Sequence, residues 1–120
     1  MAKYVDGFVL PVSKDKLEAY KKMAKKGAKM WKAYGAIDYK ECLADDLEPM
    51  GMPSLFPRMV KLKPDEVVVF SFIVYKSRAH RDQVMKKVMK DPSMNEYTND
   101  MPFNMKRMAT GGFTVMVDVA

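Results

Sequence analysis

Apolar and polar residues alternate with two different periods along this chain, and the same alternation occurs in both halves. In each half an apolar run comes first, then a segment with apolar positions three and four residues apart, and then a second apolar run. Apolar runs predict strands, and a spacing of three and four predicts a helix. The predicted strands are residues 3–12, 36–43, 66–75 and 106–119, and the predicted helices are residues 14–34 and 78–90.

Both predicted helices have recognisable ends. Ser13 and Ser77 are suitable N-caps, and Gly35 and the pair Asp91–Pro92 follow as helix stops. The first helix carries one apolar stripe formed by Leu17, Tyr20, Ala24, Ala28, Trp31 and Tyr34. Val84, Met85 and Val88 define the buried side of the second helix. Both segments therefore read as amphipathic helices that cover one face of a sheet.

The order strand, helix, strand, repeated once, narrows the fold class. Split βαβ repeats form a four-stranded antiparallel sheet with both helices on the same face. We therefore predict an α+β, ferredoxin-like βαββαβ sandwich. At 120 residues the chain fits one domain, spanning residues 1–120.

The sheet face away from the helices is predicted to be apolar. We place Val5, Gly7 and Val9 under the helices, because a glycine lets a helix approach closely. On the third strand, Val69, Ser71 and Ile73 are placed on the same side. The open face then holds Asp6, Phe8, Leu10, Phe70, Phe72 and Val74.

An apolar face of this kind marks an interface or a ligand site. A second copy of the chain could bury this face by packing sheet to sheet, or the bases of single-stranded RNA could stack on its aromatic rings. The RNA alternative is disfavoured, because the face presents Asp6 and no basic residues among its aromatic rings. The sequence therefore favours a homodimer.

Composition limits the remaining classes. The net charge is +6, and eight lysines lie within residues 14–32. A solvated helix face explains them better than a nucleic-acid site. No apolar run is long enough to cross a membrane, and the first residues lack the apolar core of a secretory signal. Cys42 is the only cysteine, so we expect a buried, inert thiol and a cytoplasmic protein.

Two long connections, 44–64 and 91–105, carry large apolar residues, among them several of the thirteen methionines. Long loops in compact domains are usually functional or disordered, and these are too apolar for disorder. We expect both to pack as a lid over a pocket or against a partner subunit. Phe103 lies in the second connection and is a candidate ligand contact.

Two residues are candidates for catalysis, each with a structural alternative. Asp6 is an acid within an apolar strand, so it is a proton acceptor or is paired with Arg107 or a backbone donor. His80 is the only histidine and is a general base or a cap residue bonded to the backbone. In both cases the structural alternative is favoured.

Trp31, Arg58 and Arg107 are candidates for ligand binding. Trp31 is a candidate wall of a cavity, although packing in the core is the favoured alternative, and Arg107 is a candidate to hold an anion. Arg58 and Arg81 suit an anionic ligand, although a salt bridge to a loop acid is the favoured alternative. One histidine and one cysteine cannot form a zinc site within one chain, and no phosphate loop or dinucleotide motif occurs. We predict no metal and no cofactor.

Several segments together resemble a known family. They are residues 4–11 (YVDGFVLP), 64–71 (PDEVVVFS), 77–82 (SRAHRD), 101–103 (MPF), 106–108 (KRM) and 111–113 (GGF). The chain resembles the YbaA-like bacterial family, known as domain of unknown function 1428. The resemblance implies a dimeric α/β barrel, an architecture shared with cofactor-free antibiotic-biosynthesis monooxygenases, and implies no activity.

The function predicted is the binding or conversion of a small apolar or aromatic ligand in a barrel cavity, between the open sheet face and the two long connections. In the catalytic version, cofactor-free oxidation or isomerisation uses Asp6 as base, Trp31 as wall, His80 as proton shuttle and Arg107 as anion holder. The alternatives are a non-catalytic dimeric module with a filled interior and, less favoured, an RNA-binding protein.

Overall fold

The computed structural model describes residues 1–97 and 101–119, and its elements follow the predicted order. The strands are β1 (Tyr4–Ser13), β2 (Asp38–Leu43), β3 (Glu66–Tyr75) and β4 (Ala109–Thr114). The helices are α1 (Leu17–Ala33), α2 (Phe56–Met59) and α3 (Arg78–Lys90). Short 3-10 turns occupy Lys14–Lys16, Pro49–Gly51, Pro92–Tyr97 and Met105–Arg107.

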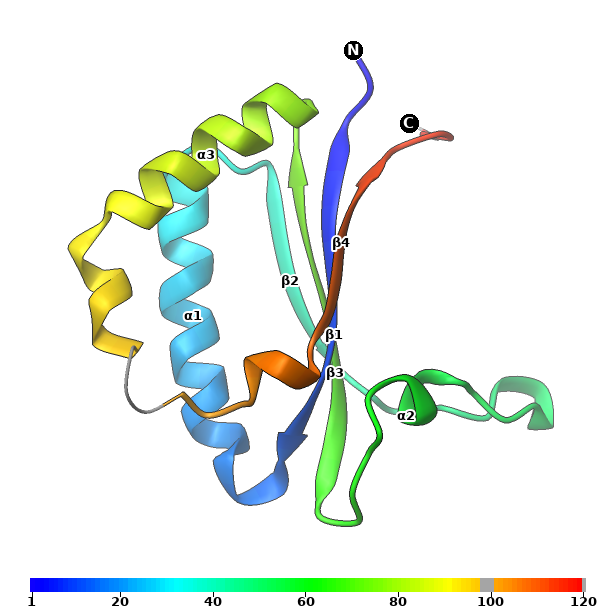
Figure 1. Cartoon of the computed structure of the whole chain (residues 1–120). Coiled ribbons are helices and arrows are strands. Elements are labelled where there is room, and N and C mark those ends of the chain that lie inside the picture. Colours follow the sequence, from blue (N-terminus) through cyan, green and yellow to red (C-terminus); the bar gives the residue numbers. More distant parts are fainter. Residues whose placement is uncertain (98–100, 120) are drawn as a thin grey trace.

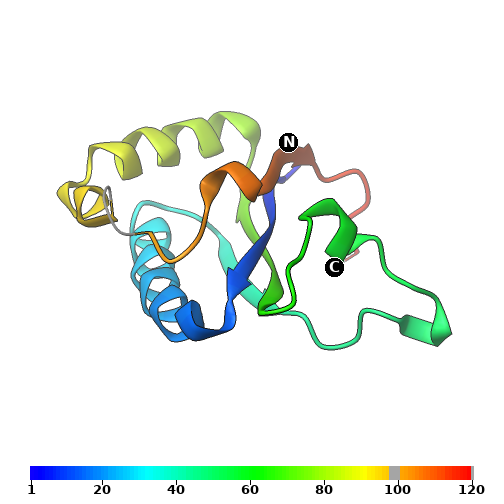
Figure 2. The ribbon, with the colours of Figure 1, turned by 60° about the horizontal axis from the view of Figure 1, so that its bottom comes forward.

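The four strands form one antiparallel sheet in the order β2-β3-β1-β4. Helices α1 and α3 cover one face, and α2 lies with its connection on the other side (Figures 1 and 2). The ferredoxin-like α+β prediction is therefore confirmed. The sheet itself is open and is not a closed barrel.

The predicted start of α3 agrees with the structure, whereas the predicted start of α1 does not. The Ser77 side chain accepts a hydrogen bond from the His80 backbone N–H at 3.1 Å, so this N-cap is confirmed. The Ser13 cap is wrong, because its hydroxyl donates to the Asp15 carboxylate at 2.6 Å and α1 begins only at Leu17, after a 3-10 turn. Gly35 ends α1 as predicted, with a φ of 115° that favours glycine.

The face of β3 was predicted correctly, and the face of β1 was wrong. Asp6 is paired with Ile73 and Leu10 with Val69, and directly paired residues share a face of the sheet. Tyr4, Asp6, Phe8 and Leu10 therefore face the helices. Gly7 lies on the opposite face, where a Cβ would stand 3.7 Å from the ring of Phe113, so it accommodates an aromatic ring and not a helix.

The face away from the helices is partly covered by the chain itself. Val60, from the connection between β2 and β3, is buried against Val9 and Val68. Further along this face Phe70 remains 42% exposed and Phe113 62% exposed. The prediction of an uncovered face is thus wrong at the end near Val60 and right around the two phenylalanines.

Two smaller predictions are also corrected. The last strand ends at Thr114 and not at residue 119, because β1 starts at Tyr4 and offers few partners beyond it; Val115 still donates to the carbonyl of Lys3. Cys42 is exposed and not buried, since it lies on edge strand β2 on the face away from the helices, paired with Phe70. No helix among the described residues is long and apolar enough to cross a membrane.

Candidate functional site

A cavity of about 740 Å³ lies between the helices and the sheet face they cover. Its floor is formed by the inward-facing residues of all four strands, and its walls by α1, α3 and the segment 101–108. The first connection, 44–64, does not line it. The predicted pocket between the open face and both connections is therefore replaced by one on the helix side, with only the second connection as a wall.

Small residues leave room for this cavity. Ser71 in the middle of the floor is flanked by Phe8 and Glu41, its partners in neighbouring strands. On α1, Gly27 lies opposite this floor, where a Cβ would stand 3.4 Å from the Tyr39 hydroxyl and 3.7 Å from the Trp31 ring. A larger residue at either position would fill space that is now empty.

An ion pair between the buried Asp6 and the half-buried Arg81 lies at one end of the cavity floor. The Arg81 Nη1 donates to the Asp6 Oδ1 at 2.6 Å, and the Asp6 residue is only 7% exposed. The Tyr75 hydroxyl lies beside the same carboxylate and accepts a hydrogen bond from the Trp31 indole N–H at 3.1 Å. The Arg81 guanidinium lies over the ring of Tyr4, 4.9 Å from its centroid. Four side chains from four elements, the partner Arg81 among them, thus surround one carboxylate.

The environment of Asp6 changes its acidity. Burial raises the pKa of Asp6 above its ordinary value, although the attraction of Arg81 and the nearby Tyr75 hydroxyl act in the opposite direction. Burial and the neighbouring Asp6 charge also raise the pKa of the Tyr75 hydroxyl, so this group keeps its proton. Asp6 is accordingly a better proton acceptor than a solvated aspartate.

A second polar cluster lies further along the cavity. The Glu41 carboxylate accepts hydrogen bonds from the Tyr20 hydroxyl at 2.7 Å and from the Tyr39 hydroxyl at 2.9 Å. Burial is the main reason that the pKa values of both tyrosines are raised, and proximity to Glu41 adds to it. Sequence reasoning missed these three residues. The signal was present in β2, where Tyr39 and Glu41 are two positions apart and so share a face.

Of the predicted site residues, three line the cavity: Asp6, Trp31 and Phe103. Arg81, proposed for an anionic ligand together with Arg58, lines it as well. Asp6 is paired with Arg81 and not with Arg107, the partner that the sequence suggested.

His80 and the two other arginines lie elsewhere. The His80 Nδ1 accepts a hydrogen bond from the Lys76 backbone N–H at 3.0 Å, as its structural alternative described, and burial lowers its pKa. Arg107 binds both carboxylate oxygens of Glu66, at 2.5 and 2.8 Å, beside a separate hollow of about 510 Å³. Arg58 is exposed on α2. None of the three lines the main cavity.

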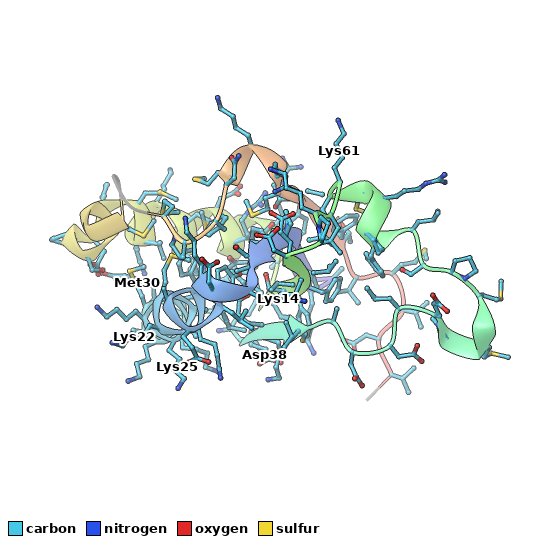
Figure 3. All side chains as sticks on the ribbon, turned by 90° about the horizontal axis from the view of Figure 1, so that it is seen from below. Lys14, Lys22, Lys25, Met30, Asp38 and Lys61 are labelled. Atoms are coloured by element: carbon cyan, nitrogen blue, oxygen red, sulfur yellow. The ribbon has the colours of Figure 1, made fainter. Side chains whose placement is uncertain are left out.

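Most of the lysine-rich side of α1 faces away from this site, although Lys26 is among the residues that line the cavity. Lys22 and Lys25 point outward from the helix, whereas Met30 lies on the side toward α3 and the turn that follows it (Figure 3). The eight lysines of residues 14–32 are all exposed, as expected for a solvated face. Within residues 1–97 and 101–119, no three histidine, cysteine, aspartate or glutamate residues gather in a way that could hold a metal ion.

Comparison with known proteins places the chain in a family. The chain is 47% identical over 116 residues to uncharacterized protein YbaA of Escherichia coli K12, which covers 97% of this chain and 98% of that protein. The protein of the same name from Shigella flexneri gives the same values. A crystal structure of a dimeric ferredoxin-like protein from an uncultured marine organism shares the fold, with a TM-score of 0.61 and 13% identity, over 99% of this chain and 100% of that one.

The family model described as "Protein of unknown function (DUF1428)" matches residues 3–105. This match and the identity to YbaA agree with the resemblance noted in the sequence. The chain belongs to the DUF1428 family.

Proposed function

We propose that this protein binds a small, predominantly apolar molecule in the cavity between sheet and helices, with the polar end of that molecule at Asp6 and Arg81. The observation that carries the proposal is a predominantly apolar cavity of about 740 Å³ with an ion pair at one end, between the buried Asp6 and the half-buried Arg81. Apolar pockets with a few converging polar groups are the usual form of small-molecule sites.

The ion pair suits a ligand with a weakly acidic group, such as a hydroxyl on an aromatic ring. Asp6 accepts the proton, since burial has raised its pKa. Arg81 bonds Asp6 through Nη1 and Asp82 through Nε, so Nη2 is the nitrogen left to hold the ligand oxygen. For an enol ligand, transfer of the hydroxyl proton to Asp6 and its return to a carbon of the ligand would be a cofactor-free isomerisation, and the proposal extends to that reaction class.

Titration of 4-phenylphenol into the protein, followed by calorimetry, tests the proposal. The Asp6→Asn variant keeps the shape of the side chain and removes the charge, so we expect binding about 10- to 100-fold weaker. The matched control is Asp118→Asn, since this exposed acid pairs with Lys3 at the surface, away from the cavity. Equal affinity in all three proteins, or no binding to the native protein, would contradict the proposal; thermal melting checks that the variants fold.

A second proposal concerns the other sheet face, which we infer is covered by a second copy of the chain. Phe70 and Phe113 are exposed there, and the Phe56 ring packs edge-on against the Phe70 ring, with 6.3 Å between the two ring centroids. Two such faces pack sheet to sheet about 10 Å apart and remove the rings from water. The dimeric ferredoxin-like protein with the same fold gives the proposal its precedent. Because the cavity lies on the helix side, ligand binding and dimer formation use different faces.

A further inference from the structure

Methionines are concentrated around the cavity. Of the thirteen in the chain, eight line it, while the other five lie elsewhere. The eight are Met23 and Met30 of α1, Met85 and Met89 of α3, and Met94, Met101, Met105 and Met108 of the residues that follow. The strands of the floor contribute none, so the cavity has a sheet floor with fixed polar groups and walls rich in thioethers.

These side chains are only partly packed against the rest of the protein. Met89 is 58% exposed and Met105 is 60% exposed, and Met23, Met30 and Met85 are half-buried. Leucine would fill a core with fewer rotamers, whereas methionine has an unbranched chain with three rotatable bonds and a polarizable sulfur. A wall of this kind adjusts to the molecule that it contacts.

We infer that the ligands of this cavity are aromatic compounds of varied outline, held by thioether–ring contacts on the methionine wall and recognised by one hydroxyl-bearing end at Asp6 and Arg81. The inference rests on the proposed function and deepens it by naming the ligand class. The end of the cavity at Asp6 and Arg81 determines which polar group of the ligand is accepted, because Tyr75 and Tyr4 pack against these two residues. The methionine wall selects an aromatic group for the rest of the ligand and accepts such groups in different shapes.

Two phenols separate aromatic recognition from simple hydrophobicity. In 4-phenylphenol and 4-cyclohexylphenol the acidic end is the same and the bodies are similar in size, but only one body is aromatic. Because each sulfur–ring contact strengthens binding by about two- to twelvefold, we expect 4-phenylphenol to bind at least about fivefold more tightly. We also expect the 2-, 3- and 4-phenylphenol isomers to bind within about tenfold of one another, since a pliable wall adapts to each outline.

A variant with Met85→Leu, Met89→Leu, Met101→Leu and Met105→Leu keeps the wall apolar and removes four sulfurs. We expect it to lose the preference for 4-phenylphenol over 4-cyclohexylphenol and to discriminate more strongly among the isomers. The matched control carries Met50→Leu, Met52→Leu, Met59→Leu and Met116→Leu, four methionines that are more than half exposed and do not line the cavity. This control is expected to behave as the native protein.

The outcomes distinguish the two proposals. If 4-cyclohexylphenol binds as tightly as 4-phenylphenol, or if the cavity variant keeps the aromatic preference, the ligand class is wrong while the binding site stands. If neither phenol binds the native protein, the proposed function fails and the ligand class fails with it. If the surface control loses the preference as fully as the cavity variant, the methionine wall is not its source and the inference is overturned.

Discussion

Gly111 and Gly112 are neighbours in β4, yet an added methyl group would meet different surroundings at each. At Gly112 a Cβ would lie 2.7 and 2.8 Å from two ring atoms of Tyr4, which is buried and supports Arg81. At Gly111 the nearest atoms belong to the exposed Phe113 ring at 3.5 Å, an ordinary contact. The requirement for glycine is therefore specific to position 112.

We expect Gly112→Ala to lower the free energy of unfolding by about 1–3 kcal/mol, because the rigid Tyr4 ring must move. Gly111→Ala is the control and is expected to change it by less than about 0.5 kcal/mol. Denaturant unfolding of both variants gives the comparison. Equal midpoints for the two would contradict the account of Tyr4. The same displacement is expected to weaken ligand binding, since Arg81 rests on that ring.

The ion pair of Glu66 with Arg107 makes the free energy of unfolding depend on pH in the acid range. Its bidentate bond to Arg107 lowers the Glu66 pKa from the ordinary 4.5 to about 2. A carboxylate with a lowered pKa stabilises the folded state fully above pH 4.5, and this contribution is lost as the pH falls toward about 2. Glu66→Gln removes the titration. Compared with the native protein, we expect the variant to have a lower free energy of unfolding at pH 7 and to lose less of it between pH 4.5 and 2. Denaturant unfolding of both proteins across this pH range measures the difference, and parallel pH profiles would refute the prediction.

At the scale of elements, the two helices of the repeat begin in different ways. Ser77 caps α3 through the His80 N–H, whereas Ser13 makes no cap bond to α1. We expect Ser77→Ala to destabilise the protein by about 0.5–2 kcal/mol, and Ser13→Ala by clearly less. Thermal or denaturant melts of the two variants give the comparison. If both substitutions had the same effect, the cap at Ser77 would contribute nothing particular.

The elements themselves were predictable from the sequence, because their periodicity is local. The strand and helix order, the buried positions Val84 and Val88 and the inward face of β3 all followed from spacing. The face of β1 did not, since a glycine within a strand indicates that another group approaches closely but does not say which group. At Gly7 it is the Phe113 ring of a neighbouring strand and not a helix. Register between strands is a tertiary property, and an error of one residue exchanges the two faces.

The candidate site was predicted only in part, because local sequence patterns single out some of its residues and not the contacts between them. Asp6 could be named because an acid is unusual within an apolar strand, Trp31 because it lies on the apolar stripe of a helix, and Phe103 because it lies in a long apolar connection. All three line the cavity. Glu41 could not, because a charged residue on an edge strand is ordinary until its partners Tyr20 and Tyr39 are known. The cavity itself depends on the distance between helices and sheet, which no local pattern encodes.

At the scale of the whole molecule, the proposed dimer predicts a mass. Sedimentation equilibrium of the native protein is expected to give twice the 13.7 kDa of one chain. Phe113→Lys places a charge on the exposed sheet face and is expected to produce monomers, while Met50→Lys, at a residue 98% exposed on the 44–64 connection, leaves the mass unchanged. A native protein that sediments as a single chain would overturn the dimer and leave the cavity untouched.

The central claim, that the space between sheet and helices is a ligand site, is tested most directly by NMR of the protein labelled with ¹³C in its methionine methyl groups. Titration with 4-phenylphenol is predicted to shift signals of the eight methionines that line the cavity. Signals of Met1, Met50, Met52, Met59 and Met116 are predicted to stay in place, since these residues lie outside it. Shifts confined to those five methionines, or no shifts at saturating phenol, would contradict the claim.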